Sequence, residues 1–107
     1  MTPTIIPDKM YILHAIDVVL HECIKSQLTS PDVAVGQEIL GLQNARAAVE
    51  QEWPLSDAMK AKLNIGPVAA KNIADWNDNL ATALMVLHHV LKHDGDMLYR
   101  LLGPPPA

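Results

Sequence analysis

Residues 67–93 read PVAAKNIADWNDNLATALMVLHHVLKH, and this stretch carries the strongest periodic signal in the chain. Its apolar residues recur at steps of three and four, which at about 100° per residue places them on one face of a helix. That face consists of Ile73, Trp76, Leu80, Ala83, Leu84, Leu87, Val90 and Leu91. Pro67 suits a first helical position and Gly95 suits a C-terminal stop. We therefore predict one long helix over 67–93, whose apolar face needs partner helices.

Two more long helices are expected before this stretch. Residues 8–28 carry a wide apolar face made of Ile12, Leu13, Ile16, Val19, Leu20, Cys23 and Ile24. Over 31–53, residues at alternating steps of four and three form a seam that includes Arg46. Ser30 is a candidate N-cap for this helix, and Pro31 fits its first turn. Because the link between the two helices is short, we expect an antiparallel hairpin.

The remaining segments are short. Cap and turn residues predict two short helices, over 56–63 and 96–102. The prolines in residues 1–7 predict an extended arm, and residues 103–107 predict a flexible Pro-rich tail.

The composition favours a helical core. Phe is absent and Trp and Tyr occur twice each, so the core must be built from aliphatic residues and alanine. Such side chains suit closely packed helices better than a sheet sandwich. The sequence therefore predicts a single all-α domain over 1–107, an up-and-down helical bundle of three long and two short helices.

Charge and cysteine content argue against several classes of protein. The formal net charge of −4 supplies no overall attraction to phosphate backbones or anionic membranes, so nucleic acid is a disfavoured partner. The single cysteine, Cys23, has no partner for an internal disulfide or a zinc cluster. Residues 1–8 lack the regions of a signal peptide, and no apolar run of about 18 residues occurs. We expect a cytoplasmic protein with no membrane partner and no cofactor.

Two pairs of histidines form the first candidate site. His14 and His21 lie seven residues apart with Asp17 between them. His89 and His93 lie four residues apart, so each set falls on one face of its helix. Imidazole and carboxylate groups at such spacing can ligate a metal ion. Both sets lie roughly opposite the apolar faces, which favours exposed histidines, and a metal site stays an alternative.

The run from His89 to Lys92, HVLK, resembles part of the signature of histidine-containing phosphotransfer domains. In those helical bundles an exposed helix histidine accepts phosphate, so the resemblance implies that role for His89. It covers four residues, and the small residue that follows the lysine in that family is His93 here. The predicted helix also stops within a turn, whereas further helix follows in the family.

The turn from Asn64 to Ile73 is the second candidate site. It resembles the hairpin of helix-hairpin-helix motifs, in which a Gly-hydrophobic-Gly turn offers backbone N–H groups to a DNA phosphate. Gly66, Ala70 and Ile73 fall on that pattern, and Asn64 stands in place of the first glycine. The resemblance implies a DNA contact through Asn64, Gly66 and Lys71. Few basic residues surround the turn, and the same residues also suit an ordinary connection between two helices.

Arg46 is the third candidate, because it occupies a position in the apolar seam of 31–53. Its charged end either extends to the edge of the bundle or pairs with a carboxylate from another helix or subunit. A polar residue in such a seam can set helix register or subunit number. We therefore expect an architectural role.

Several apolar residues fall away from the predicted core faces. The clearest are Tyr11 and Val18 in the first long helix and Met85 and Val86 in the last. Several such residues on long helices indicate a second contact surface. With Arg46, they predict a protein-interaction module, regulatory, adaptor-like or immunity-like, that binds itself as a homodimer and also binds another protein. No phosphate loop, zinc-protease helix or nucleophile elbow occurs, so an enzyme is disfavoured.

Overall fold

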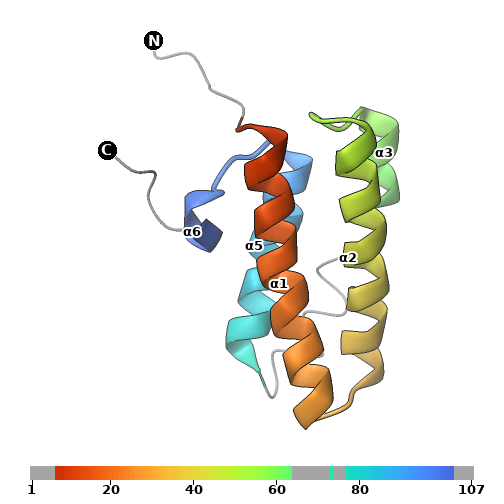
Figure 1. The fold of residues 1–107 in the computed structure, drawn as a ribbon, viewed down its shortest axis with the longest axis vertical. Coiled ribbons are helices and arrows are strands. Elements are labelled where there is room, and N and C mark those ends of the chain that lie inside the picture. The colour runs from red at the N-terminus through yellow and green to blue at the C-terminus, as the bar shows by residue number, and fades with distance from the viewer. Residues whose placement is uncertain (1–6, 64–72, 74–76, 103–107) are drawn as a thin grey trace.

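The computed structural model describes residues 7–63, 73 and 77–102. Within these residues it contains no strand and five helices: α1 (Lys9–Thr29), α2 (Val33–Gln51), α3 (Asp57–Lys62), α5 (Asp78–Lys92) and α6 (Tyr99–Leu102). Figure 1 shows α1 and α2 side by side as an antiparallel pair, with α5 behind α1 and α6 beside it. The predicted all-α bundle is confirmed for the described part of the chain.

The core lies where α1, α2 and α5 meet, and it is built from aliphatic side chains. The residues at its centre are at most 1% exposed: Ile12, Ile16, Val19, Cys23, Val35, Leu42, Val49, Leu84, Leu87, Val90 and Leu91. Full burial stabilises each Val, Leu or Ile side chain by roughly 1.5–3 kcal/mol. Ala15 and Ala45 are also buried, and their small side chains let the helices approach closely.

The single long helix predicted over 67–93 is wrong at Asn77, and residues 67–72 and 74–76 of that range lie outside the described residues. Asn77 has a φ of −150°, outside helical geometry, and its side chain accepts a hydrogen bond from the backbone N–H of Leu80 at 3.2 Å. Asn77 is therefore an N-cap, and α5 begins at Asp78. Ile73 is helical and fully buried, as its place in the apolar face predicted.

The other predicted bounds differ from the structure by smaller amounts. α1 and α3 lie within one residue of 8–28 and 56–63. α2 begins later than predicted because Asp32, and not Ser30, caps it: the Asp32 carboxylate accepts the N–H of Ala34 at 2.8 Å. Of the short helix predicted over 96–102, only Tyr99–Leu102 is helical, since turns occupy the residues before it.

A left-handed turn ends α5. The backbone N–H of Gly95 donates to the carbonyl of Val90 at 2.8 Å, the bond that closes a Schellman turn. Asp94 and Gly95 both have positive φ, of 54° and 98°, and Gly95 lies against the Pro7 ring. The chain then reverses, so that Leu98, Leu101 and Leu102 pack against the core.

The predicted arm and tail are described only at Pro7. Its carbonyl accepts a hydrogen bond from Trp53 Nε1 at 2.8 Å, which ties the start of α1 to the chain beyond α2. The rest of the arm over 1–7 and the tail over 103–107 lie outside the described residues.

Candidate interaction surface

The outer side of α1 carries a second row of residues, separate from its buried face. The row follows steps of four, three, four and four, so its members line up along the helix: Leu13, Asp17, Leu20, Ile24 and Leu28. Leu13 and Leu20 are half-buried, whereas Ile24 is 42% exposed and Leu28 is 82% exposed. The prediction that Ile24 belongs to the core face is therefore wrong, because the wide apolar face of α1 exceeds what its neighbours cover.

α2 places a matching row beside the first, made of Gly36, Ile39, Arg46 and Glu50. Ile39 is half-buried. A Cβ atom on Gly36 would lie 3.4 Å from Gln27 Nε2, so the Gln27 side chain of α1 lies against the backbone of α2 at this point. We call the two rows together the outer face.

An ion cluster joins the two rows toward the open end of the hairpin. We call the end where α1 connects to α2 the closed end, and the opposite end the open end. Arg46 Nε donates to Asp17 Oδ1 at 2.9 Å, and Arg46 Nη1 pairs with Glu50. Lys9 Nζ donates to the backbone carbonyl of Glu50 at 3.2 Å. The hydrogen bond with Asp17 raises the pKa of Arg46, so the guanidinium group stays charged. Arg46 thus pairs with a carboxylate from the neighbouring helix.

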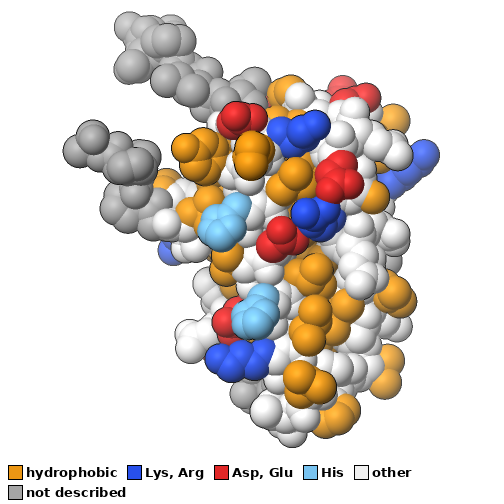
Figure 2. Space-filling view, viewed as in Figure 1, with side chains coloured by type: hydrophobic (Ala, Val, Ile, Leu, Met, Phe, Trp, Pro, Cys, Tyr) orange, Lys and Arg blue, Asp and Glu red, His pale blue; other side chains and the backbone are white. Residues whose placement is uncertain are grey.

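Figure 2 views the outer face directly. Hydrophobic side chains gather along the lower half of α1 and α2, and charged side chains gather above them. Among the described elements no helix covers this face, because α3 and α5 lie behind the hairpin in Figure 1. The surface is therefore apolar toward the closed end of the hairpin and charged toward the open end.

The predicted contact residues lie elsewhere. Tyr11, Val18 and Met85 are 59%, 36% and 52% exposed. Val18 follows Asp17 directly and so points about 100° away from the outer face. Met85 lies on α5. Val86 is half-buried and packs against the core, so its predicted exposure is wrong.

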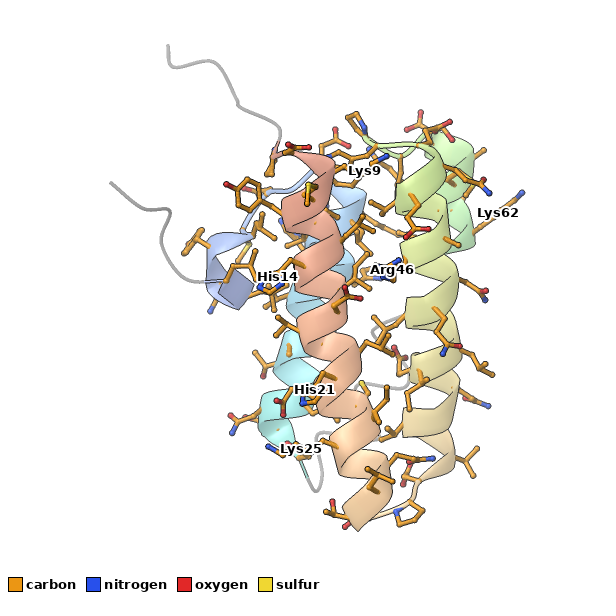
Figure 3. All side chains as sticks on the ribbon, in the orientation of Figure 1. Lys9, His14, His21, Lys25, Arg46 and Lys62 are labelled. Atoms are coloured by element: carbon orange, nitrogen blue, oxygen red, sulfur yellow. The ribbon has the colours of Figure 1, made fainter. Side chains whose placement is uncertain are left out.

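The predicted metal ligands on α1 do not converge. His14 and His21 are both exposed on α1 (Figure 3). Asp17, the carboxylate between them, pairs with Arg46. This first histidine set therefore lacks the third ligand that its spacing suggested.

The second histidine set forms a different contact. The rings of His89 and His93 lie 4.3 Å apart between centroids, and His89 Nε2 lies 2.9 Å from Asp96 Oδ2. The hydrogen bond with His89 lowers the pKa of Asp96. Across the part of the chain that the structure describes, no group of three or more His, Cys, Asp or Glu residues is placed to hold a metal ion. The pair instead links the end of α5 to the turn before α6, and sequence reasoning missed Asp96 as the partner.

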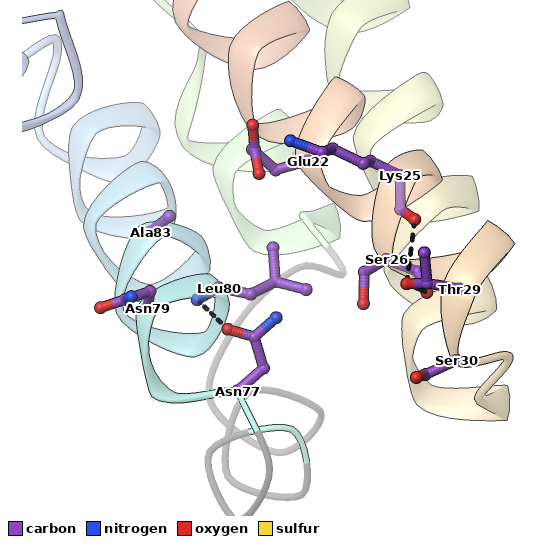
Figure 4. A pocket seen from close by; sticks show the side chains of 9 residues that line it. All are labelled: Glu22, Lys25, Ser26, Thr29, Ser30, Asn77, Asn79, Leu80 and Ala83. Atoms are coloured by element: carbon purple, nitrogen blue, oxygen red, sulfur yellow. Dashed lines mark hydrogen bonds between the residues drawn. The ribbon is translucent and has the colours of Figure 1, made fainter.

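A polar hollow lies between the last turns of α1 and the first turns of α5 (Figure 4). Its volume is about 630 Å³, and Glu22 and Lys25 face Asn77 and Asn79 across it. The Asn77 side chain is already used to cap α5. The side-chain oxygen of Asn77 is therefore engaged within the fold.

Cys23 is the only cysteine in the chain, and it is a buried free thiol. Burial, followed by the charges of Glu38 and Glu22, raises its pKa to about 12. The thiolate is the reactive form of cysteine, so Cys23 acts as a core residue and not as a nucleophile.

Asn64, Gly66 and Lys71, the residues of the helix-hairpin-helix resemblance, lie outside the described residues. None of the helices described here has both the length and the apolarity needed to cross a bilayer. Comparison with protein-family models, curated proteins and solved structures finds no match for this chain. Its function therefore has to be argued from its own surface.

Proposed function

We propose that this protein is a small helical interaction module, and that the outer face of α1 and α2 is its contact surface. The observation that carries the proposal is the exposed apolar pair Ile24 and Leu28, which continues the half-buried Leu20 along α1 and which no described helix covers. A further helix can pack against two antiparallel helices that carry apolar residues along their shared groove.

The energetics of burial support this assignment. Covering Ile24 and Leu28 with a partner would contribute roughly 1.5–3 kcal/mol for each side chain that becomes fully buried. The flanking cluster of Arg46, Asp17 and Glu50 supplies hydrogen-bonding groups at the rim, where charged pairs fix register more than they add affinity. An apolar centre beside a polar rim is the usual anatomy of a protein interface.

The alternatives have no comparable support. The residues of the DNA-binding alternative are not described, and the net charge of the chain is −4. The phosphotransfer alternative needs an accessible ring nitrogen, whereas His89 Nε2 is engaged with Asp96. We place the module in the cytoplasm, because its single cysteine is a buried free thiol and the chain has no disulfide framework of the kind that small secreted domains use.

Site-specific cross-linking in the native cell tests the proposal. A photoactivatable residue replaces Ile24 in the full chain, and illumination is expected to yield a discrete cross-linked protein. The matched control replaces Met85, which is 52% exposed but lies on α5, away from the outer face. Equal cross-linking at the two positions, or none at Ile24, would contradict the proposal.

A further inference from the structure

The charges of the outer face cancel, unlike those of the whole chain. Lys9 and Arg46 lie with Asp17 and Glu50 in one cluster, while the chain carries a net charge of −4. The excess negative charge therefore lies away from this face, where it would repel a second negative molecule. The outer face lets two copies of the chain meet without opposing like net charges.

Apart from Glu22 and Lys25, which line the hollow beside α5, the closed end of the hairpin carries few charges. Residues 26–44 contain no Lys, Arg or His. Their two carboxylates are occupied or buried: Asp32 caps α2 through the N–H of Ala34, and Glu38 is 3% exposed. A charged partner would lose hydration here without gaining ion pairs, whereas a second apolar surface would gain burial.

We infer that the occupant of the outer face is a second copy of this chain, packed hairpin to hairpin around a twofold axis parallel to the helices. The inference rests on the proposed function and names its partner. Around such an axis the outer faces of the two copies meet at the same height along the helices. The apolar half of one outer face therefore lies against the apolar half of the other. The two mixed ion clusters meet at the other end, where Arg46 approaches carboxylates of the second copy.

A perpendicular axis through the middle of the hairpin is the less favourable arrangement. It would set the apolar half of one copy against the ion cluster of the other, and would bury charges against side chains that cannot pair with them. The parallel axis instead gives a four-helix interface in which α1 and α2 of both copies surround one apolar seam.

The mass of the purified full-length protein in solution tests the inference. Light scattering during size exclusion, over a series of concentrations, is expected to give twice the monomer mass for the wild type. Ile24→Glu and Leu28→Glu place a charge in the seam and are expected to weaken the dimer at least tenfold, with helicity unchanged because both positions are exposed in the monomer. Met85→Glu, on the exposed side of α5, is the matched control and is expected to remain dimeric.

A disulfide test reports the direction of the axis without relying on a destabilising charge. Around a parallel axis, Ile24→Cys and Leu28→Cys, which lie one turn apart and are both exposed, are each expected to form a disulfide with their own copy on mild oxidation, and Met85→Cys is not. The native Cys23 is buried and does not compete. Disulfides at one of the two outer-face positions only would overturn the parallel arrangement.

The outcomes separate this inference from the proposed function. A wild type that is monomeric at every concentration, or a dimer that survives both glutamate substitutions, overturns the inference. If the monomeric protein nevertheless cross-links to a different protein through position 24 in the cell, the interaction module stands and only the identity of its partner changes.

Discussion

At the scale of single residues, Gly95 fixes the end of the bundle because it has no side chain. Its φ of 98° is strained for any other L-residue, and an added Cβ would lie 2.7 Å from Pro7 Cγ. We predict that Gly95→Ala lowers the free energy of unfolding by about 2 kcal/mol or more, from the left-handed backbone and the clash together. Urea unfolding followed by far-ultraviolet circular dichroism measures the loss.

Gly36→Ala is the control for that prediction. Its Cβ would meet only the end of the Gln27 side chain, at 3.4 Å, and the position lies within α2. Alanine is favoured over glycine in helices by up to about 1 kcal/mol, so stability should stay level or rise. Equal losses at Gly36 and Gly95 would show that φ and the Pro7 contact are not the cause.

The contact between His89 and Asp96 predicts a response to acid. The hydrogen bond with His89 lowers the pKa of Asp96 in the folded state. A carboxyl group with a lowered folded pKa adds stability above its unfolded value of about 4 and loses it as pH falls through the folded value. Asp96→Asn should therefore be less stable than the wild type near neutral pH, and the difference should shrink below about pH 4.

Thermal unfolding of both proteins between about pH 2 and pH 7 checks this response. His89→Leu removes the same interaction from the other side, so the double variant should lose little more than either single variant. A stability gap that keeps its size in acid would argue that the charge of Asp96 does not contribute.

At the scale of helices, the sequence predicted best where an apolar period ran between clear end signals. α1 and α3 match their predicted ranges within one residue. The break at Asn77 was missed because the apolar period continues across it, with Ile73 and Leu80 seven residues apart. Periodicity indicates which residues face the core, but it cannot show that the backbone leaves helical geometry at Asn77.

The candidate surface was harder to predict than the helices, for a related reason. The wide apolar face of α1 contains both the buried row and the row of Leu13, Leu20 and Ile24. How much of that width is covered depends on where α2 and α5 sit, which the spacing on α1 does not determine. The partner of His89 was missed because Asp96 reaches it through a turn with positive φ.

The break at Asn77 carries its own prediction. Asn77→Ala removes the side chain that accepts the N–H of Leu80, and loss of an N-cap costs about 1 kcal/mol of unfolding free energy. Asn79→Ala is the matched control, because Asn79 is exposed in the first turn and should change stability by less than about 0.5 kcal/mol. Urea titration of both variants distinguishes the two positions, and equal effects would count against a capping role.

At the scale of the whole molecule, the bundle is covered on one side only. α5 and α3 pack behind the α1 and α2 pair, and the outer face stays open in the described structure. If that face closes against a second copy, folding and association are linked, because the partner binds the folded chain and not the unfolded one. Apparent stability then depends on protein concentration.

This linkage predicts that the thermal midpoint of the wild type rises as the protein is concentrated. Each tenfold increase above the dissociation constant adds about 1.4 kcal/mol per mole of dimer to the apparent stability. Met85→Glu should keep the same slope, since its side chain lies on α5 and off the outer face, whereas Ile24→Glu should unfold at one midpoint across the series. Calorimetry at several concentrations measures the slopes. A wild-type midpoint that does not change with concentration would contradict self-association, and the exposed apolar row would then need a different partner.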